Sequence, residues 1–264
     1  MDKLKKQKPH IAVGTPGRIL ELIQLKKLKL KDVLCVTVDE ADRMLAEKSS
    51  WDAVTEISKR IGRDKQFLFV SATIPETLSE KTATFAPFTV QIEATGQLVN
   101  TEQVSHYYVE CEARDKIDTV RKLIYAEDIQ KGIVFVNQLE RLTETTEKFK
   151  YRGLKAASLS SDSSKQEREK VLKAFRQGEL HILVATDIAA RGLDVDDVTH
   201  IIQLDAPSEA DSYLHRSGRT GRVGKSGRVI TLLEKRQAYK VEQLKRDLNI
   251  TLQKAGLKKG RLEI

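Results

Sequence analysis

The chain has 264 residues, of which 40% are hydrophobic and 32% charged, so it can bury one large or two small cores and is not a disordered tail. No apolar run approaches the roughly 18 residues that a membrane-spanning helix needs. The start, MDKLKKQKPH, lacks the apolar segment of a secretory signal. The two cysteines predict no disulfide, which favours a reduced, cytoplasmic setting.

The net charge of +8 is concentrated at the two ends of the chain. Residues 1–31 carry nine Lys or Arg against two Asp or Glu, and residues 234–264 carry nine against four. This distribution indicates a polyanionic partner such as RNA, with basic solubilising ends as the alternative.

Short apolar runs alternate with longer amphipathic stretches along the chain. The runs are rich in Val and Ile and continuous, which predicts strands buried on both faces of a parallel sheet. They are residues 11–13, 33–38, 67–70, 90–92, 107–111, 133–136, 182–185, 201–204 and 229–233. The helical stretches between them include residues 51–61, 116–126, 139–151 and 165–176. Alternation of this kind predicts an α/β fold with right-handed crossovers.

A polar stretch, EATGQLVNTE, interrupts this pattern at residues 93–102 and predicts a linker at 94–102. After it, residues 103–233 contain about six strands, enough for a complete domain. Before it, residues 1–93 contain only about four strands, a thin set for one domain. Residues 234–264 are expected to form a basic helical tail that ends without a strand.

Acids and hydroxyls follow two strands of the first domain. Asp39-Glu40-Ala41-Asp42 comes directly after one apolar run, and Ser71-Ala72-Thr73 follows the next. Ligands bind at the carboxyl ends of parallel strands. There these acids could bind Mg²⁺ and activate water, and the hydroxyls could donate hydrogen bonds to the acids. The alternatives are acids at a helix N-terminus and an ordinary helix cap.

Three further motifs suit phosphate binding. Thr15-Pro16-Gly17-Arg18 opens a helix, Ala185-Thr186-Asp187 closes a strand, and residues 215–222 read HRSGRTGR. Helix N-termini and guanidinium groups bind phosphate oxygens, and glycine permits close approach of the backbone. The alternatives are a simple Thr-Pro helix start and a solvated basic loop.

In this order, the motifs resemble those of the DEAD-box ATP-dependent RNA helicases, from about Pro9 to Leu233. The set comprises TPGR, VDEAD, SAT, IVFVN, Gln166 with Arg168, ATDIAARGLD and HRSGRTGR. The resemblance implies an ATP hydrolase with two RecA-like domains that clamp ATP and RNA across a cleft and unwind short duplexes. It implies ATP and Mg²⁺ as cofactors, and RNA held mostly by its backbone with little sequence specificity.

The resemblance also implies residue roles. Asp39 would hold Mg²⁺ through water, Glu40 would polarise the attacking water, and Asp194 would meet the ribose. Arg219 and Arg222 would act as arginine fingers on the γ-phosphate. The residues implied to couple the nucleotide site to RNA are Asp42, Ser71, Thr73 and His215. Those implied to hold RNA are Thr15, Gly17, Arg18, Asn137, Arg168 and Thr186.

One hallmark of the resembled family does not occur in these residues. No G-x-x-x-x-G-K-[ST] phosphate loop is found, since Arg219 stands where the glycine before Gly224-Lys225-Ser226 would have to be. Together with the thin strand count, this predicts that about half of the first domain lies upstream of Met1. The alternatives to a helicase fragment are a catalytically inactive RNA- or protein-binding remnant and a DNA-translocating relative.

Overall fold

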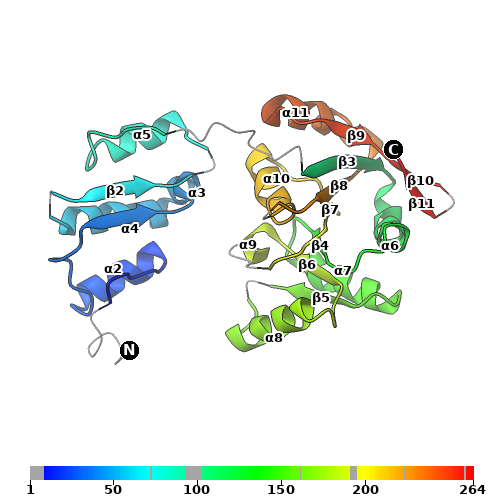
Figure 1. The fold of residues 1–264 in the computed structure, drawn as a ribbon, viewed down its shortest axis with the longest axis horizontal. Coiled ribbons are helices and arrows are strands. Elements are labelled where there is room, and N and C mark those ends of the chain that lie inside the picture. Colours follow the sequence, from blue (N-terminus) through cyan, green and yellow to red (C-terminus); the bar gives the residue numbers. More distant parts are fainter. Residues whose placement is uncertain are drawn as a thin grey trace. The chain divides into compact units, whose positions relative to one another are not determined.

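The computed structural model describes residues 9–62, 64–71, 73–92, 103–160, 162–190, 195–222, 224–258 and 260–264. The chain divides into two compact units, residues 1–94 and 95–264 (Figure 1). The predicted linker at 94–102 and the predicted ribose contact Asp194 lie outside the described residues.

The second unit is built on one sheet of seven parallel strands in the order β5-β6-β4-β7-β8-β3-β9. Their bounds are β3 (Val104–Glu110), β4 (Gly132–Phe135), β5 (Ala156–Leu159), β6 (Ile182–Ala185), β7 (His200–Gln203), β8 (Gly227–Leu233) and β9 (Leu252–Lys254). The α/β class and parallel sheet predicted from the sequence are confirmed. β4, β6 and β7 are buried along their whole length, as their continuous apolar runs predicted.

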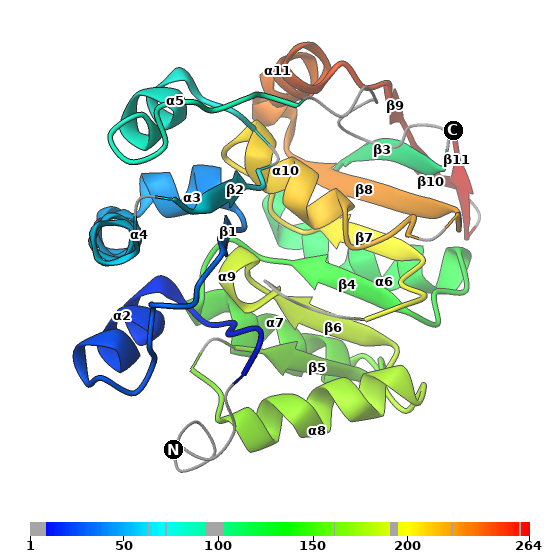
Figure 2. The same ribbon diagram turned by 60° about the vertical axis from the view of Figure 1, so that its left-hand side comes forward.

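Helices cover both faces of this sheet (Figure 2). Phe135 faces a core shared with α8 (Lys165–Arg176), α9 (Asp187–Ala190), α10 (Ala210–Ser217) and α11 (Tyr239–Leu248). Its neighbour Val134 faces the opposite core, shared with α6 (Lys116–Ala126) and α7 (Glu140–Tyr151). Successive strand residues point to opposite faces, so each strand supplies both cores. Two short 3₁₀ turns, η1 (Ala113–Asp115) and η2 (Lys235–Gln237), precede α6 and α11.

α8 begins where its sequence specifies. Ser164 Oγ accepts the Glu167 N–H at 3.2 Å, and the Glu167 carboxylate accepts the Ser164 N–H at 2.9 Å. This reciprocal pair is a capping box and satisfies backbone donors that a helix start leaves without partners. The predicted helices at 116–126 and 165–176 are confirmed to the residue.

The tail was only partly predicted. Its helix is present as α11, but the expectation that residues 234–264 end without a strand is wrong, because β9 pairs with β3 at the edge of the sheet. β10 (Gly256–Lys258) and β11 (Arg261–Glu263) then form an antiparallel hairpin. Three-residue strands give almost no periodic signal, and pairing with an existing sheet edge determines their conformation.

The first unit contains two parallel strands, β1 (Cys35–Val38) and β2 (Gln66–Phe69), in the described residues. Four helices accompany them in the part of this unit that the structure describes: α2 (Pro16–Gln24), α3 (Ala41–Ala46), α4 (Lys48–Arg60) and α5 (Glu76–Thr82). Trp51 and Val54 of α4 and Leu78 of α5 pack with Val38 in a small core.

Two expectations for the first unit are wrong. The apolar runs at 11–13 and 90–92 are not strands, so the described residues hold two strands here rather than about four. A strand needs a hydrogen-bonding neighbour, and the described residues place none beside these runs. β1 and β2 are also not buried on both faces: Cys35 and Thr37 are exposed while Val38 is buried.

None of the helices in the described part of the chain has the length and apolar content needed to cross a bilayer. Both cysteines are free thiols, in agreement with the prediction of no disulfide.

Candidate functional site

A tight turn carries the acidic motif from β1 into α3. Glu40 has φ 51° and ψ 48°, the left-handed conformation that a residue with a side chain adopts only at a cost. The Glu40 N–H donates to Asp39 Oδ1 at 2.9 Å, and the Ala41 N–H donates to the Val70 carbonyl at 3.1 Å. The turn is therefore fastened to the end of β2, and it presents Asp39 at the carboxyl end of β1.

Asp42 connects this motif to the hydroxyls that follow β2. Its carboxylate accepts the Thr73 hydroxyl at 2.9 Å and the Thr73 N–H at 3.2 Å. Its own N–H donates to Ser71 Oγ at 3.0 Å. The contact between acids and hydroxyls that the sequence suggested is present in the structure.

This network changes the acidity of Asp42. Partial burial acts to raise the pKa of the carboxyl, but hydrogen bonds from Thr73, Arg43 and Ser71 together outweigh it and hold the pKa below its ordinary value. Asp42 therefore carries a negative charge at neutral pH and holds the Ser71 and Thr73 segment in place.

The residues at the end of β1 suit Mg²⁺ only in an open site. Asp39 is exposed and accepts a single backbone N–H, so it can contact a cation directly or through water. No group of three or more potential metal ligands occurs among the described residues. Mg²⁺ characteristically uses one or two carboxylates together with water and substrate phosphates, which fits a lone exposed Asp39.

The TPGR motif lies at the start of α2. Thr15 is the N-cap residue, Pro16 is the first helical residue, and the Thr15 side chain does not cap the helix. Arg18 pairs with Glu21 one turn on. A Cβ on Gly17 would meet nothing within 4 Å, so the surface at this helix start is open to a ligand.

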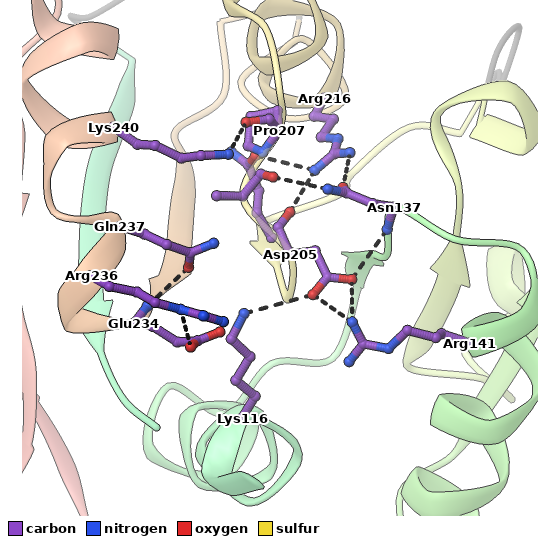
Figure 3. Close-up of polar contacts among 12 residues, drawn as sticks. Lys116, Asn137, Arg141, Asp205, Pro207, Arg216, Glu234, Arg236, Gln237 and Lys240 are labelled. Carbon is purple, nitrogen blue, oxygen red and sulfur yellow. Dashed lines mark hydrogen bonds and ion pairs between the residues drawn. The ribbon is translucent and has the colours of Figure 1, made fainter. Parts of the chain in front are cut away.

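In the second unit, Arg216 joins three motifs, and Figure 3 shows its contact with Asn137. Its side chain is 1% exposed. Its guanidinium donates to both oxygens of Asp187 at 2.7 and 2.8 Å and to Asn137 Oδ1 at 2.8 Å. Arg216 Nη1 also donates to the Asp205 carbonyl at 2.9 Å. The Arg216 Cζ atom lies 5.1 Å from the centroid of the Phe135 ring. Five donors on one rigid fork allow Arg216 to bond the ends of β4, β6 and β7 together.

The alternative of a solvated basic loop is therefore wrong for Arg216, because paired hydrogen bonds make burial of its charge tolerable. Arg219 and Arg222 lie further along the same motif and are half-buried. Their Nε atoms donate to the His215 and Gly218 carbonyls at 3.3 and 2.9 Å. These bonds fix the direction in which each guanidinium projects.

Gly221 separates the two arginines and has φ 67°. A Cβ at this position would lie 2.3 Å from Val104 Cγ2. Glycine is required here by both the backbone conformation and the close approach to β3, so this part of the loop has little freedom.

The predicted RNA-binding residues of the second unit also make internal contacts. Asn137 Nδ2 donates to the Ala206 carbonyl at 3.0 Å, and Arg168 Nη2 donates to the Ala189 carbonyl at 2.9 Å. Thr186 Oγ1 accepts the Ala189 N–H at 3.4 Å. Asn137 and Thr186 come at the ends of β4 and β6, and Arg168 steadies α9 from α8. Their roles toward RNA stay predictions.

Sequence reasoning gave no role to Asp187 and Asp205. Asp205 accepts two bonds from Arg141, at 2.9 and 3.0 Å, and the Asn137 N–H at 3.2 Å. Asp205 follows a buried apolar run directly, as Asp39 does, and Asp187 follows one after a single residue, so a similar signal could have found them. The role of Arg216 could not be found in this way, because its burial depends on three loops that are distant in sequence.

Comparison with known proteins identifies the relatives of this chain. The profile described as DEAD/DEAH box helicase matches residues 1–81, and that described as helicase conserved C-terminal domain matches residues 115–224. The chain is 44% identical over 260 residues to the DEAD-box ATP-dependent RNA helicase CshC of Bacillus cereus. It is 37% identical over 263 residues to the probable ATP-dependent RNA helicase YfmL of Bacillus subtilis. These alignments cover 98% and 100% of this chain, which spans 66% and 69% of the two relatives.

Solved structures give the same result. S. cerevisiae Dbp5 bound to RNA and ADP BeF3 matches with a TM-score of 0.83 and 27% identity, over 92% of this chain and 64% of that one. A DEAD box protein from the hyperthermophile Methanococcus jannaschii matches with a TM-score of 0.56 and 32% identity, over 93% of this chain and 66% of that one.

Proposed function

We propose that this chain, which belongs to the DEAD-box family of RNA helicases, carries the RNA-binding and hydrolysis-triggering residues of an RNA-stimulated ATPase that unwinds short duplexes. The observation that supports this most is the bond between Asp42 and Thr73, because it joins the acids proposed for hydrolysis to a segment proposed to respond to RNA. Hydrogen-bond networks of this kind can carry energetic coupling between two sites.

The proposed chemistry assigns one task to each acid. Asp39 holds Mg²⁺, which when bound neutralises charge on the ATP phosphates. Glu40 orients the attacking water and accepts its proton. The left-handed turn sets the direction of the Glu40 side chain, and Arg43 holds it in an ion pair, with Nη1 3.6 Å from Glu40 Oε2.

The second unit supplies positive charge and RNA contacts in this proposal. Arg219 and Arg222 stabilise the negative charge that develops on the γ-phosphate, and Asp194 contacts the ribose. His215 lies in the last turn of α10, directly before Arg216, and relays RNA binding to the arginines. The residues that hold RNA phosphates and sugars are Thr15, Gly17, Arg18, Asn137, Arg168 and Thr186.

Backbone recognition predicts little preference for base sequence. Phosphate and sugar contacts fix the register of a strand but do not read its bases. Homopolymeric single-stranded RNAs should therefore bind with similar affinity, and affinity should fall steeply as the salt concentration rises. We place this activity in the cytoplasm, in agreement with two free thiols.

A second candidate is an RNA-binding module without turnover. It is favoured by the absence of a G-x-x-x-x-G-K-[ST] loop from these residues, since that loop and its lysine cradle the phosphates in other nucleotide hydrolases. Both candidates predict RNA binding, and only the first predicts hydrolysis by this chain.

One experiment distinguishes the two. Phosphate release from ATP and Mg²⁺ is measured for the purified chain with and without single-stranded RNA, and RNA binding is followed by fluorescence anisotropy. RNA-dependent release that falls about 10³-fold or more in Arg219→Ala, with ATP binding retained, supports the ATPase. Binding of RNA without release supports the module, and failure to bind RNA contradicts both. The matched control is Lys59→Gln on the exposed side of α4, which should change neither signal.

A further inference from the structure

A polar pocket of about 220 Å³ opens in the second unit, beside the ends of β4, β7 and β8 (Figure 3). Lys116, Arg141 and Lys240 line it, together with Asp205, Glu234 and Gln237. It is smaller than the cavities that hold drug-sized ligands, so it suits a small group. Lys116, Arg141 and Lys240 have no part in the hydrolysis or the RNA binding proposed above.

Positive charge exceeds negative charge in this pocket. Among the described residues that line the pocket, Asp205 is the only acid in an ion pair with Lys116 and with Arg141, and it bonds mainly to Arg141. Glu234 pairs with Arg236 at 2.9 Å. Lys240 donates to the Pro207 carbonyl at 3.1 Å, which is a neutral partner. Arg236 lies outside the lining and neutralises Glu234, so the three lining cations face Asp205 alone, which leaves an excess of two positive charges.

Lys116 has an unusual position. Its side chain is 6% exposed, and its ammonium lies 3.7 Å from Asp205 Oδ1, beyond hydrogen-bond distance. Lys116 Nζ is not one of the fully enclosed polar atoms that lack a partner in the described residues, so its three donors face the open space of the pocket. An acceptor inside the pocket would satisfy them.

Two helix starts add to the positive field. Lys116 is the first residue of α6, and Arg141 is the second residue of α7. The N-terminal ends of both helices carry partial positive charge, which favours an anion. The Gln237 Oε1 accepts the Glu234 N–H at 3.1 Å, so its NH₂ group is a further donor at the wall.

The lowered pKa of Lys240 agrees with an excess of positive charge around the pocket. Burial lowers the pKa of its ammonium, and repulsion from Arg216 and Lys116 lowers it further. A neighbouring anion would reverse the second effect.

We propose that this pocket binds a small free phosphate compound as a dianion, held by Lys116, Arg141, Lys240 and the Gln237 amide. A phosphate dianion balances the two excess charges, whereas a carboxylate balances one. Its oxygens also match the guanidinium fork of Arg141. Because the ligand binds the folded protein, it stabilises the second unit.

Titration calorimetry and thermal unfolding of the full chain with inorganic phosphate and with pyrophosphate test this proposal. Sodium chloride at matched ionic strength is the reference. Saturable binding with a rise in the unfolding midpoint is expected, weakened about 10- to 100-fold in Lys240→Gln and in Arg141→Gln, the loss typical of one charge-assisted hydrogen bond. The control Lys245→Gln removes a cation from α11 that pairs with Glu242, and it should bind the probes as the parent does.

Three outcomes would overturn the proposal. The first is absence of saturable binding beyond the salt effect. The second is binding that survives in both pocket variants but is lost in Arg219→Ala, which would place the probes at the residues proposed for ATP. The third is binding of a 5′-phosphorylated RNA, but not of the free probes, through Lys240 and Arg141. Failure of hydrolysis by the chain affects none of these measurements.

Discussion

The Arg216 guanidinium holds both oxygens of the Asp187 carboxylate, with Nε 2.7 Å from Oδ1 and Nη2 2.8 Å from Oδ2. The same group reaches Asn137 and the Asp205 carbonyl. A single buried cation therefore fixes the ends of three neighbouring strands, which are the positions from which the proposed RNA contacts project.

Arg216→Gln should destabilise the second unit by about 3 kcal/mol, because it leaves Asp187 without its cation and removes several hydrogen bonds. Urea unfolding of that unit measures the change. Lys148→Gln, which breaks an exposed pair with Glu144, should stay within about 0.5 kcal/mol of the parent. A cost for Arg216→Gln no larger than that of the control would show that the network contributes little to stability.

Thr73→Val should remove the hydroxyl that donates to Asp42 and cost about 1 kcal/mol of first-unit stability. It should also raise the Asp42 pKa toward its ordinary value. A carboxyl with a lowered native pKa stabilises the fold above its unfolded pKa, and this contribution is lost as the pH falls through the native pKa. The variant should therefore lose less stability on acidification than the parent.

NMR titration of the Asp42 carboxyl carbon checks this directly. Thr84→Val is the matched control, because the Thr84 hydroxyl donates to the Lys81 carbonyl and not to an acid. Equal Asp42 pKa values in the parent and in Thr73→Val would contradict the proposed role of this bond.

His106 should make the second unit acid-sensitive. Burial lowers the pKa of its imidazole to about 4, and its Nδ1 lies 2.8 Å from the Tyr213 hydroxyl. In the unfolded chain His106 takes up a proton near its ordinary pKa of about 6.5. Its contribution to the free energy of unfolding is therefore complete above that pH and is lost as the pH falls toward about 4. The full loss is about 3 kcal/mol.

Urea midpoints at about pH 7.5 and about pH 5 measure this dependence. His106→Gln should reduce the difference between the two midpoints. His200 is also buried with a lowered pKa, and it is unchanged in the variant, so part of the dependence persists. An identical pH dependence in parent and variant would exclude His106 as its source.

Gly221→Ala should disturb the loop that carries Arg219 and Arg222. The new methyl group meets Val104, and the positive φ adds strain, for a cost of about 2 kcal/mol. Gly224→Ala also has positive φ, 77°, but its methyl group meets nothing within 4 Å, so it should cost about 1 kcal/mol. Thermal unfolding compares the two, and a larger loss in Gly224→Ala would contradict the close-contact argument.

The sequence alone determined the α/β class, the motifs and five strands of the second unit, whereas β5 and β9 were not predicted. Runs such as residues 133–136 and 182–185 are apolar throughout because they lie between two helical layers, and that burial is visible in composition. The helix at 165–176 was predictable because its start is encoded locally by Ser164 and Glu167.

Only the tertiary structure decided which motif residues are buried and what they contact. Arg216 and Arg219 are three residues apart in one motif, yet the first is enclosed by Asp187, Asn137 and Asp205, and the second is half-buried. The tertiary structure also decided the conformation of β9, which is a strand because it pairs with the edge strand β3. It likewise decided the excess of positive charge around Lys116. Such properties depend on groups distant in sequence, whose burial and electrostatic fields no local pattern encodes.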